Sequence, residues 1–134
     1  MKSNKIYFGH PINTYHTVLE SKLIKIIHKE FPNIEIENPA DEFHQENCEK
    51  YKKERGSGMI YFYEEILPKM SAGIFLPFRD GKLGAGVYSE AKFLYNNKTP
   101  VYEISFKGKI GQINLDSSRA LSIDKTRKRI LVNF

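Results

Sequence analysis

The sequence is poor in cysteine: Cys48 is the only one among 134 residues. A single cysteine excludes a disulfide framework within the chain, and free thiols are typical of reducing compartments, so we expect a cytoplasmic protein. The chain also lacks an apolar run of 18 residues and a signal-peptide pattern over its opening residues, so we expect neither a membrane span nor a leader. Cys48 has no glycine elbow or adjacent base around it, which favours an ordinary thiol over a nucleophile.

Internal repeats, low-complexity stretches and linkers are absent as well. A chain of 134 residues is long enough for one core of about five strands with covering helices. Four side chains that could ligate a metal share no recognisable spacing: His16, Glu42, His44 and Glu46. We therefore expect a single domain over residues 1–134, with no metal site and no cofactor.

Basic residues outnumber acidic ones, which gives a net charge of +5. The excess lies in two groups, Lys50, Lys52, Lys53 and Arg55 in mid-chain and Lys125, Arg127, Lys128 and Arg129 near the end. Solvated helix faces explain both groups as well as a phosphate-binding stripe does, and no nucleic-acid-binding signature accompanies them. We expect small anionic molecules, rather than nucleic acid or a membrane, as partners.

The most informative segment is AGIFLPFRDGKLGAGVYSEAKFLYNN, residues 72–97. Its apolar run 73–78 predicts a buried parallel strand, and the spacing of apolar residues over 87–97 predicts a helix. The glycine-rich loop between them therefore lies at the carboxyl end of a strand and the amino end of a helix. Ligands bind at that edge of open α/β sheets, and glycines there allow a ligand to approach the backbone closely.

Glu90 lies about one turn into this predicted helix, where the helix dipole helps a carboxylate to stay ionised. An ionised carboxylate beside such a loop indicates a nucleophile or an acceptor for ribose hydroxyls. The alternative is a first-turn acid that only complements the dipole. The loop glycines Gly81, Gly84 and Gly86 match neither a dinucleotide-binding fingerprint nor a phosphate-binding loop with its lysine and serine or threonine.

The rest of the chain alternates strand and helix patterns. We expect strands over 5–8, 34–36 and 100–104. Helices are expected from Asn13 or Thr14 to residue 30, over 59–70 and over 122–129. Residues 41–55 should form an exposed helix or a mobile lid, and residues 106–115 a loop or hairpin. Ser57 is a candidate cap for the 59–70 helix, and Pro68 should bend its end. The pattern predicts a compact, three-layer α/β domain with a central, mostly parallel sheet of about five strands, of the Rossmann or flavodoxin-like kind.

Two segments together resemble the nucleoside 2-deoxyribosyltransferase family and its relatives, the deoxynucleoside monophosphate N-glycosidases. The opening KIYFGHPINTY, residues 5–15, is similar to the family's first strand and the turn that faces the nucleoside. The segment GVYSEA, residues 86–91, resembles the family's Gly-x-x-x-Glu, in which the glutamate is the glycosyl nucleophile. The intervening YEEILPKMSAGIFLPF is similar to the helix before the third strand, so the resemblance covers residues 4–104.

Several positions depart from the family pattern. The aspartate that holds the sugar hydroxyls, six residues before the nucleophile, is replaced by Gly84, and an Ala-Asp pair is replaced by Ala72 and Gly73. A further acid of the family falls on Glu65, and a glycine after the nucleophile is Lys92. The resemblance therefore implies a diverged member, one with an altered substrate or one that binds without turnover.

The resemblance assigns roles to particular residues. Glu90 would stabilise or trap the cationic sugar, and Glu65, close to it, would have a raised pKa and protonate the leaving base. Tyr7 and His10 would contact the base, the sugar or a phosphate, and Asp80 could replace the missing sugar ligand. Gly9, Gly84 and Gly86 complete the expected substrate-binding set.

Each residue also has a structural interpretation. Glu65 would be a solvated helix residue, Tyr7 part of the core, His10 a cap of the strand turn, and Asp80 a residue that closes the turn with Gly81. The leading hypothesis is a glycosyltransferase or N-glycosidase acting on a nucleoside or nucleotide. The alternative is a non-catalytic protein that binds nucleotides or nucleoside derivatives on the same fold.

Three consecutive aromatic residues, Tyr61, Phe62 and Tyr63, span too wide an arc of a helix to face one core. We expect part of this surface to be exposed in a monomer and buried in a homodimer or larger oligomer, as the resemblance also implies. The apolar C-terminal residues 131–134 could pack across that interface or pair as an edge strand. The alternative is that the aromatics lie under the 41–55 segment.

Overall fold

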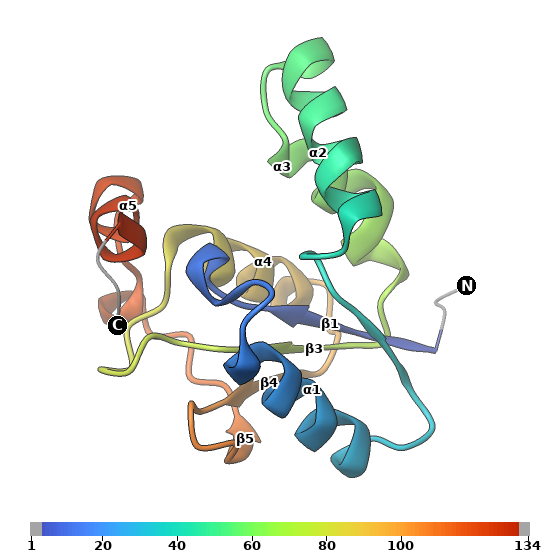
Figure 1. The fold of residues 1–134 in the computed structure, drawn as a ribbon, viewed down its shortest axis with the longest axis vertical. Helices are drawn as coiled ribbons and strands as arrows, with labels where there is room; N and C mark the ends of the chain where they lie inside the picture. Colours follow the sequence, from blue (N-terminus) through green and yellow to red (C-terminus); the bar gives the residue numbers. More distant parts are fainter. Residues whose placement is uncertain (1–3, 132–134) are drawn as a thin grey trace.

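The computed structural model describes residues 4–131 and contains a five-stranded sheet with the order β2-β1-β3-β4-β5 (Figure 1). The strands are β1 (Lys5–Gly9), β2 (Glu35–Glu37), β3 (Ala72–Phe75), β4 (Val101–Ile104) and β5 (Ile110–Gln112). The first four are parallel to one another, and β5 is antiparallel to β4. The predicted α/β class with a mostly parallel sheet is confirmed, and residues 106–115 form the hairpin rather than the loop.

Residues 4–131 also contain five helices and four short helical turns, and η4 and α5 follow the last strand. The helices are α1 (Val18–Glu30), α2 (Glu42–Arg55), α3 (Met59–Tyr61), α4 (Ala85–Asn96) and α5 (Ile123–Leu131), and the turns are η1 (Ile12–Thr14), η2 (Phe62–Ile66), η3 (Leu67–Lys69) and η4 (Ser117–Arg119). Within residues 4–131, no helix is both long and apolar enough to cross a membrane.

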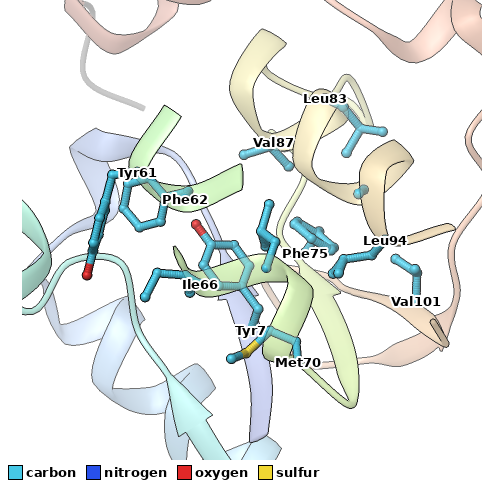
Figure 2. Packing of buried hydrophobic residues seen from close by; sticks show 12 residues of the cluster. Tyr7, Tyr61, Phe62, Ile66, Met70, Phe75, Leu83, Val87, Leu94 and Val101 are labelled. Carbon is cyan, nitrogen blue, oxygen red and sulfur yellow. The ribbon is translucent and has the colours of Figure 1, made fainter. Parts of the chain in front are cut away.

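Strand alternation divides the core into two clusters, one on each face of the sheet. Ile6 and Phe8 of β1 pack with Leu23 and Ile27 of α1. Tyr7, between them, points to the opposite face and packs with residues of α3, η2 and α4 (Figure 2). Tyr7 is thus both a core residue and, by its position, available to a site on the α4 side of the sheet.

The first helix starts later than its sequence pattern predicts. Asn13 and Thr14 lie in the short turn η1, and the cap of α1 is Thr17, whose side chain accepts a hydrogen bond from the Glu20 amide. Pro11 precedes η1, and its carbonyl oxygen accepts from both the amide and the hydroxyl of Thr14. The prediction of a helix from residue 13 or 14 is wrong because these local bonds close a separate turn first.

The segment 59–69 is helical but not a regular α-helix, and Met70 is extended. One α-helical turn, α3, is followed by the π-helical η2 and the 3-10 helical η3, which contains Pro68. Proline cannot donate the hydrogen bond that a continuing α-helix requires, and the helical segment changes to a 3-10 turn that includes Pro68 and ends one residue later. The hydroxyl oxygen of Ser57 accepts from the Met59 amide at the start of the segment.

The three consecutive aromatic residues do not form an exposed patch. Tyr61 and Phe62 are only 4% and 5% exposed, and Tyr63 packs against the same cluster. Each ring has a different neighbour: Tyr61 lies against α2, Phe62 against Tyr7, and Tyr63 against Phe93 of α4. The expected exposed surface is therefore wrong, because elements on three sides enclose this segment.

Helix α2 is the segment for which an exposed helix or a mobile lid is expected. Its outer face is charged, and His44 is its one buried residue. The His44 ring bonds to Tyr61 through Nδ1, at 2.6 Å, and lies 3.3 Å from the Glu37 carboxylate through Nε2. Figure 1 shows α2 beside α3, beyond the edge of the sheet. These contacts attach α2 to β2 and to the α3 segment.

The remaining boundaries differ by a few residues. Strand β3 ends at Phe75 rather than at residue 78, and the last helix spans Ile123–Leu131 rather than 122–129. Leu131 ends that helix and is 85% exposed. The edge strand or interface contact expected of 131–134 otherwise lies outside the described residues.

The strand order places a crevice between β1 and β3. The chain leaves β1 for α1 on one face and reaches α4 on the other face after β3. The loops at the carboxyl ends of these two strands therefore diverge, and open α/β sheets bind ligands at such a point.

Candidate functional site

A cavity of about 190 Å³ lies at the carboxyl ends of β1 and β3. It is lined by residues from the loop after β1, from α2 and α3, from the loop after β3, and from α4 and α5. They are Tyr7, His10, Pro11, Ile12, Tyr15, Pro39, Gln45, Cys48, Met59, Phe62, Phe78, Gly84, Gly86, Val87, Glu90, Thr126 and Ile130. The lining is mostly apolar and aromatic, with a few polar groups, as in many small-molecule sites.

Glu90 supplies the carboxyl group of this cavity. It lies on the second turn of α4 and is only 7% exposed. The Tyr7 hydroxyl donates to Glu90 Oε2 over 2.7 Å. No donor to Oε1 is found among residues 4–131, so this oxygen remains available to a molecule in the cavity. The sequence prediction that Glu90 belongs to a site at this edge is consistent with this placement.

Burial changes the electrostatics expected of Glu90. Removal from water raises its pKa from 4.5 to about 7, and the hydrogen bond from Tyr7 only partly opposes that rise. Burial therefore opposes the ionisation that the position near the helix start favours. The Tyr7 hydroxyl itself has a pKa raised well above its usual value, by burial and by the Glu90 charge, so it stays a donor. Near neutral pH, Glu90 exchanges a proton readily.

Four further polar residues line the cavity that the sequence does not identify as site residues: Tyr15, Gln45, Cys48 and Thr126. Tyr15 lies in the loop after β1, and burial followed by the Glu90 charge raises the pKa of its hydroxyl. Gln45 of α2 donates through Nε2 to the Pro39 carbonyl oxygen at 2.7 Å, and this bond orients the side-chain amide. The amide oxygen of Gln45 takes no part in it. Cys48, also on α2, has a thiol pKa raised by burial, with Glu49 and Glu90 contributing. Only contact between distant segments reveals these residues.

His10 lines the cavity, but its polar atoms are already bonded. Nδ1 lies 2.8 Å from the Phe8 carbonyl oxygen, and Nε2 lies 2.8 Å from Glu20 Oε2. Burial is the largest single influence on Glu20 and would raise its pKa, but the contacts with His10, His16 and Asn38 together lower the carboxyl pKa. Because both ring nitrogens face acceptors, His10 presents its ring rather than an N–H group. The expected contact of His10 with a sugar or phosphate oxygen is therefore wrong.

The predicted glycines have different roles. Gly84 and Gly86 line the cavity, and Gly86 has open space where a side chain would begin. Gly9 is not among the lining residues: a Cβ there would lie 2.4 Å from the Phe75 ring. Gly9 is thus required by packing between β1 and β3 rather than by a ligand.

Packing is tight at both positions where the resembling family carries an acid that this sequence lacks. A Cβ on Gly73 would lie 2.5 Å from Leu94 of α4 and 2.8 Å from the Phe75 ring. A Cβ on Gly84 would lie 3.3 Å from the Thr126 methyl group of α5. An acid at position 73 would thus displace Leu94 or Phe75, whereas one at position 84 would require a smaller shift of Thr126.

Asp80 and Glu65 lie outside the cavity lining. Both carboxylate oxygens of Asp80 accept hydrogen bonds from Arg129, each at 2.7 Å, and this pairing lowers the Asp80 pKa to about 2. Glu65 is exposed and accepts from the Tyr51 hydroxyl at 3.1 Å. Asp80 is therefore not a sugar ligand and Glu65 is not a neighbour of Glu90 in the cavity, because η2 and the 80–82 turn direct them elsewhere.

Within residues 4–131, no three metal-ligating side chains form a group that could hold an ion. Comparison of the chain with protein-family models, with curated proteins and with solved structures finds no match.

Proposed function

We propose that the protein cleaves or transfers the glycosidic bond of a nucleoside, with Glu90 as the group that attacks the sugar. The observation that carries the proposal is the buried Glu90 carboxyl, bonded to Tyr7 at 2.7 Å and open to the cavity through Oε1. The order of Tyr7, the glycine loop and Glu90 is also that of the nucleoside 2-deoxyribosyltransferase family, which the sequence resembles. On this proposal the domain is a three-layer, flavodoxin-like fold, whose strand order begins 2-1-3.

The chemistry requires Glu90 in its ionised form. Oε1 attacks the anomeric carbon as the bond to the base breaks, and the electron pair of that bond leaves with the base. Water or a second acceptor then displaces Glu90 from the sugar. The Tyr7 hydroxyl holds the other carboxylate oxygen in place throughout, which orients the nucleophile.

The departing base also needs a proton. Among the described residues, Glu90 is the one carboxylic side chain that lines the cavity. With Glu65 outside, solvent is the proton source in this proposal, and bases that leave readily should react fastest.

The cavity chemistry favours an uncharged nucleoside over a nucleotide. No lysine or arginine occurs among the described lining residues, and both nitrogens of His10 are bonded within the protein. A 5′-phosphate would add negative charge near Glu90 without a cation to pair it, and burying such a charge is unfavourable. The net charge of the chain favours a small anionic ligand, but the described cavity lining holds no lysine or arginine to pair with one.

A second candidate function is binding without turnover. Gly84 stands where the resembling family holds the sugar hydroxyls with an acid, and α5 fills the adjacent space. A protein of this kind would bind a nucleoside derivative in the cavity and leave its glycosidic bond intact. The homodimer or larger oligomer is now a prediction from the resemblance alone, because the aromatic surface that favoured it is buried.

Incubation with a panel of 2′-deoxynucleosides, followed by chromatography for free base, tests the proposal. We expect base release from at least one nucleoside by the wild-type protein and a loss of at least 100-fold in Glu90→Gln. Glu65→Gln is the matched control and should retain the wild-type rate. Absence of base release, combined with saturable nucleoside binding, would instead favour the binding protein.

A further inference from the structure

The last helix, α5, forms one wall of the cavity through Thr126 and Ile130. None of its residues is buried, and Ile123 and Leu131 are 61% and 85% exposed. A nine-residue helix is too short to be stable by itself in water, so its position depends on its contacts with the rest of the domain.

The chain just before α5 is bonded firmly to the glycine loop. The Leu83 amide donates to the Arg119 carbonyl at 2.7 Å, and the Leu121 amide donates back to the Leu83 carbonyl at 2.9 Å. The Arg119 side chain adds a bond to the Gly81 carbonyl at 2.9 Å. The backbone is thus anchored up to Leu121, immediately before the helix.

Beyond that anchor, polar contacts hold the helix against the site. Both terminal nitrogens of Arg129 donate to Asp80, each over 2.7 Å, and the guanidinium lies 5.3 Å from the centre of the Phe78 ring. Thr126 Oγ1 accepts from the Ala85 amide at the start of α4, over 2.9 Å. Asp80 and Arg129 are both partly exposed, so the ion pair can break without burying an unpaired charge.

The cavity is small in its present shape. Its volume of about 190 Å³ is below the range of roughly 300–1,000 Å³ that is typical of sites for drug-sized ligands. The walls from β1, η2 and α4 include the core residues Tyr7, Phe62 and Val87, whereas α5 contributes no buried residue. Helix α2 also lines the cavity, but its buried His44 bonds to Tyr61 and lies against Glu37. Of the helices that line the cavity, α5 can therefore move with the least disturbance of the core.

We propose that α5 is a movable wall that opens and closes the cavity, and that Asp80 and Arg129 are positioning residues that hold it closed. The helix pivots after Leu121, its Thr126 leaves the amino end of α4, and the space above Gly84 opens to a ligand. The ligand class, a nucleoside, rests on the proposed function, but the movement of α5 does not.

Cys48 offers a test that needs neither a ligand nor catalysis. It is the only cysteine of the chain, it lines the same cavity, and it is partly buried. The experiment measures the labelling rate of Cys48 by a neutral aromatic maleimide in the full-length protein. We expect Asp80→Asn and Arg129→Gln each to raise that rate about two- to fivefold, the effect of losing a partly exposed ion pair.

Two further variants separate this effect from general destabilisation. Arg127→Gln removes a similar charge from the same helix, where Arg127 is exposed, and should leave the rate unchanged. The charge swap Asp80→Arg with Arg129→Asp should return the rate towards that of the wild type. Equal rates in all variants, or a swap that labels as fast as the single variants, would overturn the proposal.

Hydrogen exchange supplies a second measurement on the same variants. In Arg129→Gln, the amides of α5 should lose protection while those of α4 and of the sheet keep it. Equal loss of protection in all three would show general unfolding and would overturn the role of the ion pair.

With 2′-deoxyadenosine as probe, saturating nucleoside should slow Cys48 labelling. If the Asp80 and Arg129 variants change the labelling rate of Cys48 and the nucleoside does not, the movable wall stands and the proposed ligand is wrong.

Discussion

Burial of Glu90 predicts an unusual effect of a neutral substitution on stability. In Glu90→Gln, the side chain keeps its shape and can still accept the Tyr7 hydrogen bond, but it cannot ionise. In the wild type, the pKa is about 7 when folded, against 4.5 ordinarily. The unfolded chain therefore loses its proton first as pH rises, and the wild type loses stability between pH 4.5 and 7. The difference between the two pKa values corresponds to a loss of about 3 kcal/mol in the free energy of unfolding above pH 7.

The prediction is checked by urea unfolding of both proteins at pH 5 and at pH 8. Glu90→Gln should be more stable than the wild type by about 3 kcal/mol at pH 8 and by less than about 1 kcal/mol at pH 5. Glu65→Gln, in which the exposed side chain loses its charge, should show no such difference between the two pH values. An effect of Glu90→Gln that is equal at both pH values would refute the reasoning, because it would mean that Glu90 ionises when folded as easily as when unfolded.

Three further predictions concern the site. Tyr7→Phe removes the bond that lowers the Glu90 pKa, so the acid limb of the pH–rate profile, near pH 7 in the wild type, should move to higher pH; an unmoved limb would separate Tyr7 from Glu90. A 2′-deoxynucleoside should react at least tenfold faster than its 5′-monophosphate, as competition kinetics would measure, because the described cavity lining holds no lysine or arginine. Gly84→Asp should expose the α5 amides to hydrogen exchange, since its side chain meets Thr126; unchanged protection would contradict that packing.

Local patterns predicted the sheet well. The apolar run after Gly73 and the short opening strand both appear, because runs of buried apolar residues between turn residues have few alternatives. The start of α1 was missed because the hydroxyl of Thr14 bonds back to Pro11, and such side-chain bonds compete with a helix. The strand order was not predictable, since it depends on which face each crossover takes.

The site was only partly predictable for a similar reason. Glu90 and Tyr7 lie on regular elements next to the loops, so their position follows from the pattern. Gln45 and Thr126 come from α2 and α5, whose docking depends on contacts far along the chain. Glu65 was misplaced because η2 is a π-helical turn, which alters the direction of every side chain in it.

The central claim is that Glu90 bonds covalently to the sugar of a nucleoside. Acid quenching of the wild-type protein during turnover of its best 2′-deoxynucleoside, followed by peptide mass mapping, measures this directly. We expect a deoxyribosyl group on the peptide that contains Glu90, and none in Glu90→Gln. Base release at the wild-type rate by Glu90→Gln, or a sugar adduct on another residue, would contradict it.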